Sequence, residues 1–220
     1  MNPSPAPSAA PLIPLRLKIA YTAFLAVMIP VYWINYGPTN FLYFCDVALL
    51  LTLAGVWRED PLLISMPAVG ILVPQALWCA DFLVQLMGGR MTGMTGYMFD
   101  AQHPLFLRGL SLFHGWLPFL LVYLVRKTGY DRRALPGWTL LAAILCLIAF
   151  FLLPEAGAVL ADPKTPRNVN YVFGMDDAKA QQLLPAPAYL VAWMAALTGL
   201  VFVPTHFVLK KCCPRALKPA

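Results

Sequence analysis

The 220-residue sequence contains little charge. Asp, Glu, Lys and Arg make up only 12% of it, whereas 60% of the residues are hydrophobic. So few charged side chains cannot cover the water-facing surface of a soluble domain. No long polar block interrupts the apolar sequence, so we expect one membrane-embedded unit and no separate soluble domain.

The sequence also lacks the short motifs that bind nucleotides or metals. It has no glycine-rich phosphate loop, dinucleotide fingerprint or zinc-binding helix motif, so energy-coupled transport by this chain alone is not expected. Its cysteines have no metal-site spacing and lie in or beside apolar segments, which gives no basis for a disulfide framework. They are Cys45, Cys79, Cys146, Cys212 and Cys213. We predict no cofactor and no metal.

Six apolar stretches predict the fold. They cover residues 19–36, 41–57, 62–87, 105–125, 135–153 and 188–209. Most reach the ~20 residues that a helix needs to cross a bilayer, and the second is at the short end. We predict an all-α bundle of six transmembrane helices over residues 16–211. A disordered lead-in without secretory-signal features is expected over residues 1–15, and a cytoplasmic tail over residues 212–220.

The basic residues predict the orientation in the plasma (inner) membrane. With a cytoplasmic N-terminus, the cytoplasmic side carries Arg16, Lys18, Arg58, Arg126, Lys127, Arg132, Arg133, Lys210, Lys211, Arg215 and Lys218. The opposite side carries only Arg90, Lys164, Arg167 and Lys179. This bias places both termini in the cytoplasm. The net charge of +6 then faces anionic headgroups. We expect membrane lipids as partners and no nucleic acid, and the oligomeric state stays open.

Polar side chains inside three of the stretches indicate a site near the outer face. They are Cys45, Asp46, Asp81, Arg108, Ser111 and His114. At ~1.5 Å per helical residue, their depths run from about 6 Å for Arg108 to roughly 15 Å for His114. Ionisable groups in hydrocarbon need a partner or water. We therefore predict a polar cavity that opens outward.

Two interpretations of this cluster stay open. In the structural one, Arg108 pairs with Asp46 or Asp81 and fixes the helix packing. In the functional one, a thiolate at Cys45 acts as nucleophile and His114 accepts its proton, with Asp46 or Asp81 fixing the imidazole tautomer. Arg108 and the Ser111 hydroxyl would then stabilise an oxyanion or hold a headgroup phosphate.

Four short motifs resemble those of the YwaF-like integral membrane proteins of bacteria. They are Cys45-Asp46-Val47-Ala48-Leu49-Leu50-Leu51, Phe113-His114-Gly115, Asn170-Tyr171-Val172-Phe173 and Pro187-Ala188-Tyr189. These proteins are similar to six-helix membrane enzymes that transfer or hydrolyse fatty acyl groups with a Cys or Thr and a His. The resemblance implies that Cys45 and His114 form this pair. The family usually has a second His where this sequence has Tyr43.

Two outer loops are expected to lie over the site, either as lids or as ordinary connections. The first, residues 88–103, carries Met91, Met94 and Met98, which suit contact with lipid; binding Cu(I) together with His103 is the alternative. The second, residues 154–187, is expected to contain a short interfacial helix over residues 178–184, after two acidic residues.

The sequence therefore predicts an acyltransferase or acyl-ester hydrolase acting on lipids. Its catalytic residues would be Cys45, His114 and Asp46, and its substrate-binding residues Arg108, Ser111, Asp81, Tyr43, Asn170 and Tyr171. The alternative is a non-catalytic membrane protein. It would bind or carry a lipophilic molecule, or act as a scaffold subunit.

Overall fold

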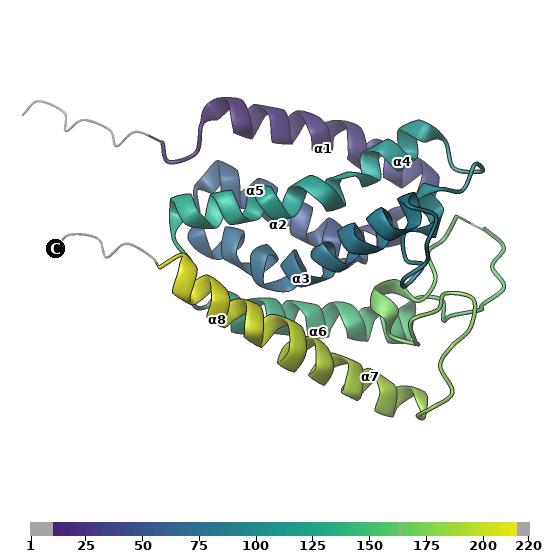
Figure 1. Cartoon of the computed structure of the whole chain (residues 1–220). Helices are drawn as coiled ribbons and strands as arrows, with labels where there is room; N and C mark the ends of the chain where they lie inside the picture. The colour runs from purple at the N-terminus through teal and green to yellow at the C-terminus, as the bar shows by residue number, and fades with distance from the viewer. Residues whose placement is uncertain (1–10, 163, 215–220) are drawn as a thin grey trace, which may run out of the picture.

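The computed structural model describes residues 11–162 and 164–214. The α-helices in these ranges run roughly along one common axis and are joined by turns and loops (Figure 1). The α-helices are α1 (Leu15–Tyr36), α2 (Phe44–Arg58), α3 (Pro61–Leu86), α4 (Leu105–Ser111), α5 (Phe113–Thr128), α6 (Ala134–Leu152), α7 (Ala186–Ala196) and α8 (Val203–Cys212). Short 3-10 helices cover Pro38–Leu42, Gly96–Met98 and Val169–Tyr171, and a π-helical segment, Leu197–Phe202, joins α7 to α8. The described residues contain no β-strand, so this part of the protein is all-α.

The two ends of the bundle differ in what they carry. One end holds residues 11–14 and 213–214 and the tight turns at residues 59–60 and 129–133; we call it the terminal end (Figure 1). The other holds the connections over residues 37–43, 87–104 and 153–185; we call it the loop end. Residues 1–10 of the expected lead-in and 215–220 of the expected tail lie outside the described residues.

Five helical stretches are long and apolar enough to cross a membrane. They are Leu15–Tyr36, Pro61–Leu86, Leu105–Thr128, Ala134–Leu152 and Ala186–Cys212. The remaining helix, α2, has 15 residues. It begins at Phe44, later than the expected residue 41, because Pro38 opens a 3-10 turn and Tyr43 is extended (φ −63°, ψ 141°).

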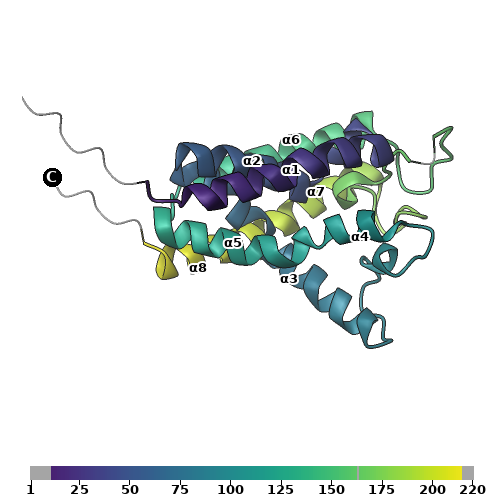
Figure 2. The same ribbon diagram turned by 90° about the horizontal axis from the view of Figure 1, so that it is seen from above.

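Helix α3 lies at the centre of the bundle and packs against α2, α5, α6 and α8. It packs tightly on α6, where the fully buried Trp138 ring occupies the space beside Gly70. A Cβ on Gly70 would overlap that ring, so only glycine permits this approach. The last turns of α3 diverge from the other helices at the loop end (Figure 2).

Two of the long helical stretches are interrupted, and a proline accounts for the second interruption. Leu112 separates α4 from α5, and the π-helical segment precedes Pro204 in the last helix. Proline has no backbone N–H, so the hydrogen-bond pattern before it must change.

The expected interfacial helix over residues 178–184 is wrong, because the described segment is irregular. The Asp176 carboxylate accepts from the Ala178 N–H, and the Gln181 side chain accepts from the N–H groups of Leu183 and Leu184. These local hydrogen bonds compete with a helical ladder. The regular helix starts only after Pro185, at Ala186.

Candidate functional site

A cavity of about 610 Å³ lies at the loop end. Side chains from helices α1 to α5, from α7 and from the π-helical segment line it together with both long loops. Seven of the residues expected at the site are among them: Tyr43, Cys45, Asp46, Ser111, His114, Asn170 and Tyr171. Asp81 and Arg108 do not line it.

His114 is held in one orientation at the start of α5. Its Nδ1 lies 2.8 Å from the Ser111 carbonyl oxygen, which can only accept, so Nδ1 carries the proton and a neutral ring leaves Nε2 as the basic atom. The ring stacks on Trp78 at 4.9 Å between centroids and on Phe113 at 4.0 Å. A backbone carbonyl thus fixes the tautomer, the role that was expected for Asp46 or Asp81.

Cys45 lies in the first turn of α2 and faces the same cavity. Helices α2 and α3 run antiparallel, and Gly55 of α2 packs closely on Ile64 of α3. Cys45 precedes Gly55 by ten residues, so along the bundle axis it is level with the residue about ten positions after Ile64, near residue 74. His114 is level with Trp78, roughly 6 Å nearer the loop end. Thiol and imidazole therefore share one cavity, and no hydrogen bond joins them within the described chain.

Asp46 is buried, at 3% exposure, and also lines the cavity. Its Oδ2 accepts from Asn40 Nδ2 at 3.0 Å, and its Oδ1 has no hydrogen-bond partner in the described structure. A buried carboxylate oxygen without a donor is costly, by about 1–3 kcal/mol or more. Oδ1 is therefore an acceptor that a ligand can satisfy.

Gln75 is a second buried acceptor, which the sequence did not single out. It is 3% exposed, lines the cavity, and its Oε1 has no partner among the described residues. Its signal in the sequence is a lone amide after Pro74 in an otherwise apolar stretch of α3. Because Asp46 is level with about residue 73, the two acceptors differ in level by roughly 3 Å along the helices.

Asp81 organises the first loop instead of facing the cavity. Its carboxylate accepts from the N–H groups of Thr92, Gly93 and Thr95 and from the Thr95 hydroxyl, at 2.6–3.0 Å. Its side chain is completely buried by this loop. The carboxylate at the end of α3 thus acts as a fixed anchor for residues 92–95.

Arg108 is also used by the first loop. Its Nη1 donates to the Met98 carbonyl at 2.9 Å, and no ion pair joins it to Asp46 or Asp81 in the described structure. Ser111, one turn further along the chain, shares a hydrogen bond of 2.8 Å with the Tyr32 hydroxyl at the cavity wall. Arg108 and Asp81 therefore stabilise the cover of the cavity, while Ser111 forms part of its wall.

Asn170 joins the second loop to the start of α2. Its side chain accepts from the Phe44 N–H and donates to the Leu42 carbonyl, both at 2.9 Å. Its own carbonyl accepts from Trp193 Nε1 of α7. Asn170 adopts a left-handed conformation (φ 60°), which Asn tolerates better than most residues. The loop thereby fixes the turn of α2 that presents Cys45.

Tyr171 and Asp177 form the loop side of the cavity. Burial, with a smaller contribution from the negative charge of Asp177, raises the pKa of the Tyr171 phenol to about 12, so it remains a neutral hydroxyl. Burial also raises the pKa of Asp177, while a hydrogen bond from Asn168 opposes that rise. The Tyr171 hydroxyl is thus a polar wall group that does not act as a base at neutral pH, and Asp177 adds a carboxyl group to the same wall.

The mouth of the cavity has a basic part and an apolar part. Lys164 and Arg167 of the second loop line the basic part. Val73 and Leu77 of α3 line the apolar part and remain 46% and 42% exposed. Cations of the second loop therefore border the cavity on one side, and the apolar surface of α3 borders it on another side.

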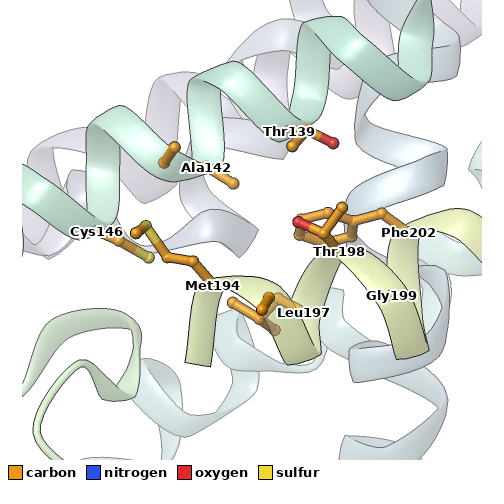
Figure 3. A pocket seen from close by; sticks show the side chains of 10 residues that line it. Thr139, Ala142, Cys146, Met194, Leu197, Thr198, Gly199 and Phe202 are labelled. Atoms are coloured by element: carbon orange, nitrogen blue, oxygen red, sulfur yellow. The ribbon is translucent and has the colours of Figure 1, made fainter. Parts of the chain in front are cut away.

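A second, smaller hollow of about 480 Å³ lies between α6 and the π-helical segment (Figure 3). Small and apolar residues line most of it, including Ala142, Cys146 and Gly199. Thr139 and Thr198 supply its only hydroxyl groups among the lining residues, which offers little for specific recognition.

No protein-family model, curated protein or solved structure matches this chain. Among the described residues, no group of three or more His, Cys, Asp or Glu side chains could hold a metal ion. The chemistry of the larger cavity must therefore be inferred from its own geometry.

Proposed function

We propose that this protein is a six-helix plasma-membrane protein whose loop end faces outward and whose larger cavity binds an amphipathic lipid. The sixth span would be α2, which runs antiparallel to α3 and whose 15 residues extend about 22 Å. The distribution of basic residues supports the orientation, because Lys18, Arg133 and Lys210 lie towards the terminal end.

The observation that carries the proposal is the combination of groups around one cavity. Its volume of about 610 Å³ falls within the range of small-molecule sites and suits a headgroup with part of one chain. Lys164 and Arg167 can pair with an anionic phosphate. The exposed surface around Val73 and Leu77 lets the rest of the chain extend into the bilayer.

A tryptophan at the apolar mouth tests this function. Leu77→Trp should block lateral entry, whereas Leu83→Trp is the matched control, because Leu83 is 55% exposed on the same helix and does not line the cavity. We expect saturable binding of a short-chain fluorescent phospholipid to the wild type and to Leu83→Trp, and at least a tenfold weaker affinity for Leu77→Trp. Equal binding by all three proteins would show that the lipid does not enter here.

Acyl transfer or hydrolysis, as the likeness to the YwaF-like proteins implies, is a second candidate. It is favoured by one observation: the Cys45 thiol and the His114 ring line the same cavity. In this mechanism, Cys45 Sγ attacks the carbonyl carbon of a lipid ester while His114 Nε2 accepts the thiol proton. The alkoxide leaves with that proton, and water or an acceptor alcohol then cleaves the thioester.

Intact-protein mass spectrometry separates the two functions. After incubation with a short-chain activated ester, catalysis predicts an acyl adduct that disappears in Cys45→Ala and forms more slowly in His114→Ala. Cys146→Ala is the control, because this thiol lines the other hollow. Adduct formation independent of both Cys45 and His114, or none at all, would refute catalysis and leave lipid binding as the function.

A further inference from the structure

Asp46 and Gln75 supply two buried acceptors to the larger cavity, and no described cation pairs with either; we call these two side chains the floor of the cavity. Asp46 Oδ1 and Gln75 Oε1 have no hydrogen-bond partner in the described chain, and both residues are 97% buried. None of the ion pairs between described residues includes Asp46. A carboxylate in this environment needs a positive charge or several donors to offset its desolvation.

We propose that this floor, formed by Asp46 and Gln75, binds a primary ammonium group of the cavity's ligand. The inference rests on the proposed binding function of the cavity and names the chemistry that these two buried acceptors recognise. A primary ammonium carries one positive charge and three N–H donors. Two of these donors would satisfy Asp46 Oδ1 and Gln75 Oε1, and the charge would compensate the carboxylate.

The walls next to the floor also suit an organic cation. The rings of Tyr32, Tyr36 and Trp78 line the same cavity. Aromatic faces attract ammonium groups, which adds to the interaction with the carboxylate. Asn40 Nδ2 already donates to Asp46 Oδ2, so the carboxylate is fixed with its other oxygen free for the ligand.

The position of the basic residues agrees with this assignment. Tyr43, one helical turn before Asp46 on the chain, donates to the Arg167 carbonyl at 3.4 Å. The loop with Arg167 and Lys164 therefore lies nearer the loop end than the carboxylate does. Cations at the mouth and an anion on the floor fit a ligand whose ammonium enters first and whose anionic group stays outside.

Three probes with the same six-carbon chain distinguish the contribution of the positive charge to binding from that of the hydrogen-bond donors. Hexylammonium has both, hexyltrimethylammonium has the charge without an N–H, and hexanol has a donor without the charge. We would measure the thermal unfolding midpoint of the full chain in phosphatidylcholine nanodiscs against probe concentration. The expected result is an apparent affinity for hexylammonium at least about tenfold higher than for either other probe.

Two substitutions and one control locate the effect. Asp46→Asn and Gln75→Leu should each remove most of the hexylammonium preference. Thr139→Val should leave it unchanged, because Thr139 Oγ1 is also an unpartnered buried atom but lies at the smaller hollow. If Asp46→Asn does not fold, Gln75→Leu and the ratio of the three probes on the wild type still decide the question.

Each outcome has a definite meaning. Equal affinities for hexylammonium and hexyltrimethylammonium, or a preference that survives both substitutions, would overturn the ammonium site. If that happens while Leu77→Trp still reduces lipid binding, the proposed function stands without it. If phosphatidylethanolamine in the nanodiscs abolishes hexylammonium binding, the ammonium comes from a lipid headgroup; if not, the site takes a free amine.

Discussion

The terminal end and the loop end of the bundle use the same kinds of helices for different purposes. At the terminal end, Lys18 pairs with Glu59 at 2.8 Å. Towards the middle of α3, the Trp138 ring fills the space beside Gly70. At the loop end, the helices leave a cavity of about 610 Å³ with unpartnered acceptors. Dense packing in one part thus provides the rigidity that an open polar site in the other requires.

The largest expected effect comes from filling the dense part. Gly70→Ala places a methyl group into the Trp138 ring, and such overpacking costs about 3 kcal/mol or more. Gly115→Ala, in α5 beside the cavity, meets no atom within 4 Å and should gain about 0.5–1 kcal/mol from helix propensity. The unfolding midpoints of the two variants in detergent should therefore move in opposite directions; a similar shift for both would show that the two parts are equally tolerant.

The second prediction concerns the anchor of the first loop. Asp81→Asn replaces one acceptor oxygen with an amide donor that faces the N–H groups of Thr92, Gly93 and Thr95, at a cost of about 2 kcal/mol. Hydrogen exchange of residues 92–95 should become faster while that of α6 stays slow. Asp100→Asn is the control, because Asp100 accepts from Gln102 in an exposed turn.

If exchange over residues 92–95 remains slow in Asp81→Asn, the loop is held by its other contacts. Residues 92–95 would then be as rigid as the terminal end. The difference in packing between the two ends would be confined to the cavity itself.

The sequence indicated the helical class and the polar side chains of the loop end, because ionisable residues stand out in apolar stretches. Cys45, Asp46, Ser111 and His114 do line one cavity, as their estimated depths suggested. The six-helix count and the orientation stay predictions. The true levels differ from the estimated depths because the helices do not all end at one level: α3 has 26 residues and α2 only 15.

Other features of the site depend on loop geometry that no periodicity reveals. Asp81 and Arg108 have suitable depths for the cavity, yet the first loop folds back and takes their hydrogen bonds. Asn170 binds the backbone of residues 42 and 44 from a position far along the chain. Gln75 is hard to predict because a neutral amide in an apolar stretch is a weaker signal than a charged side chain.

The smallest expected effect is at the terminal end, where Glu59 holds the segment before α1. Its carboxylate accepts from the Leu12 and Ile13 N–H groups and from Lys18 Nζ, at 2.8–3.1 Å. Burial alone would raise the pKa of Glu59, but these hydrogen bonds outweigh it and lower the pKa below the ordinary value of 4.5. The stabilisation is therefore present above pH 4.5 and disappears as the pH falls through the lowered value.

Glu59→Gln tests this anchor at neutral pH. Glutamine keeps one acceptor but loses the charge, and partly exposed ion pairs contribute only about 1 kcal/mol or less. The amides of Leu12 and Ile13 should exchange faster, while the unfolding midpoint changes little. Glu155→Gln, in the second loop, should affect neither amide. A large drop in the unfolding midpoint of Glu59→Gln would contradict this expectation. It would show that the hydrogen bonds of Glu59 stabilise the whole bundle and belong to the dense packing that supports the cavity.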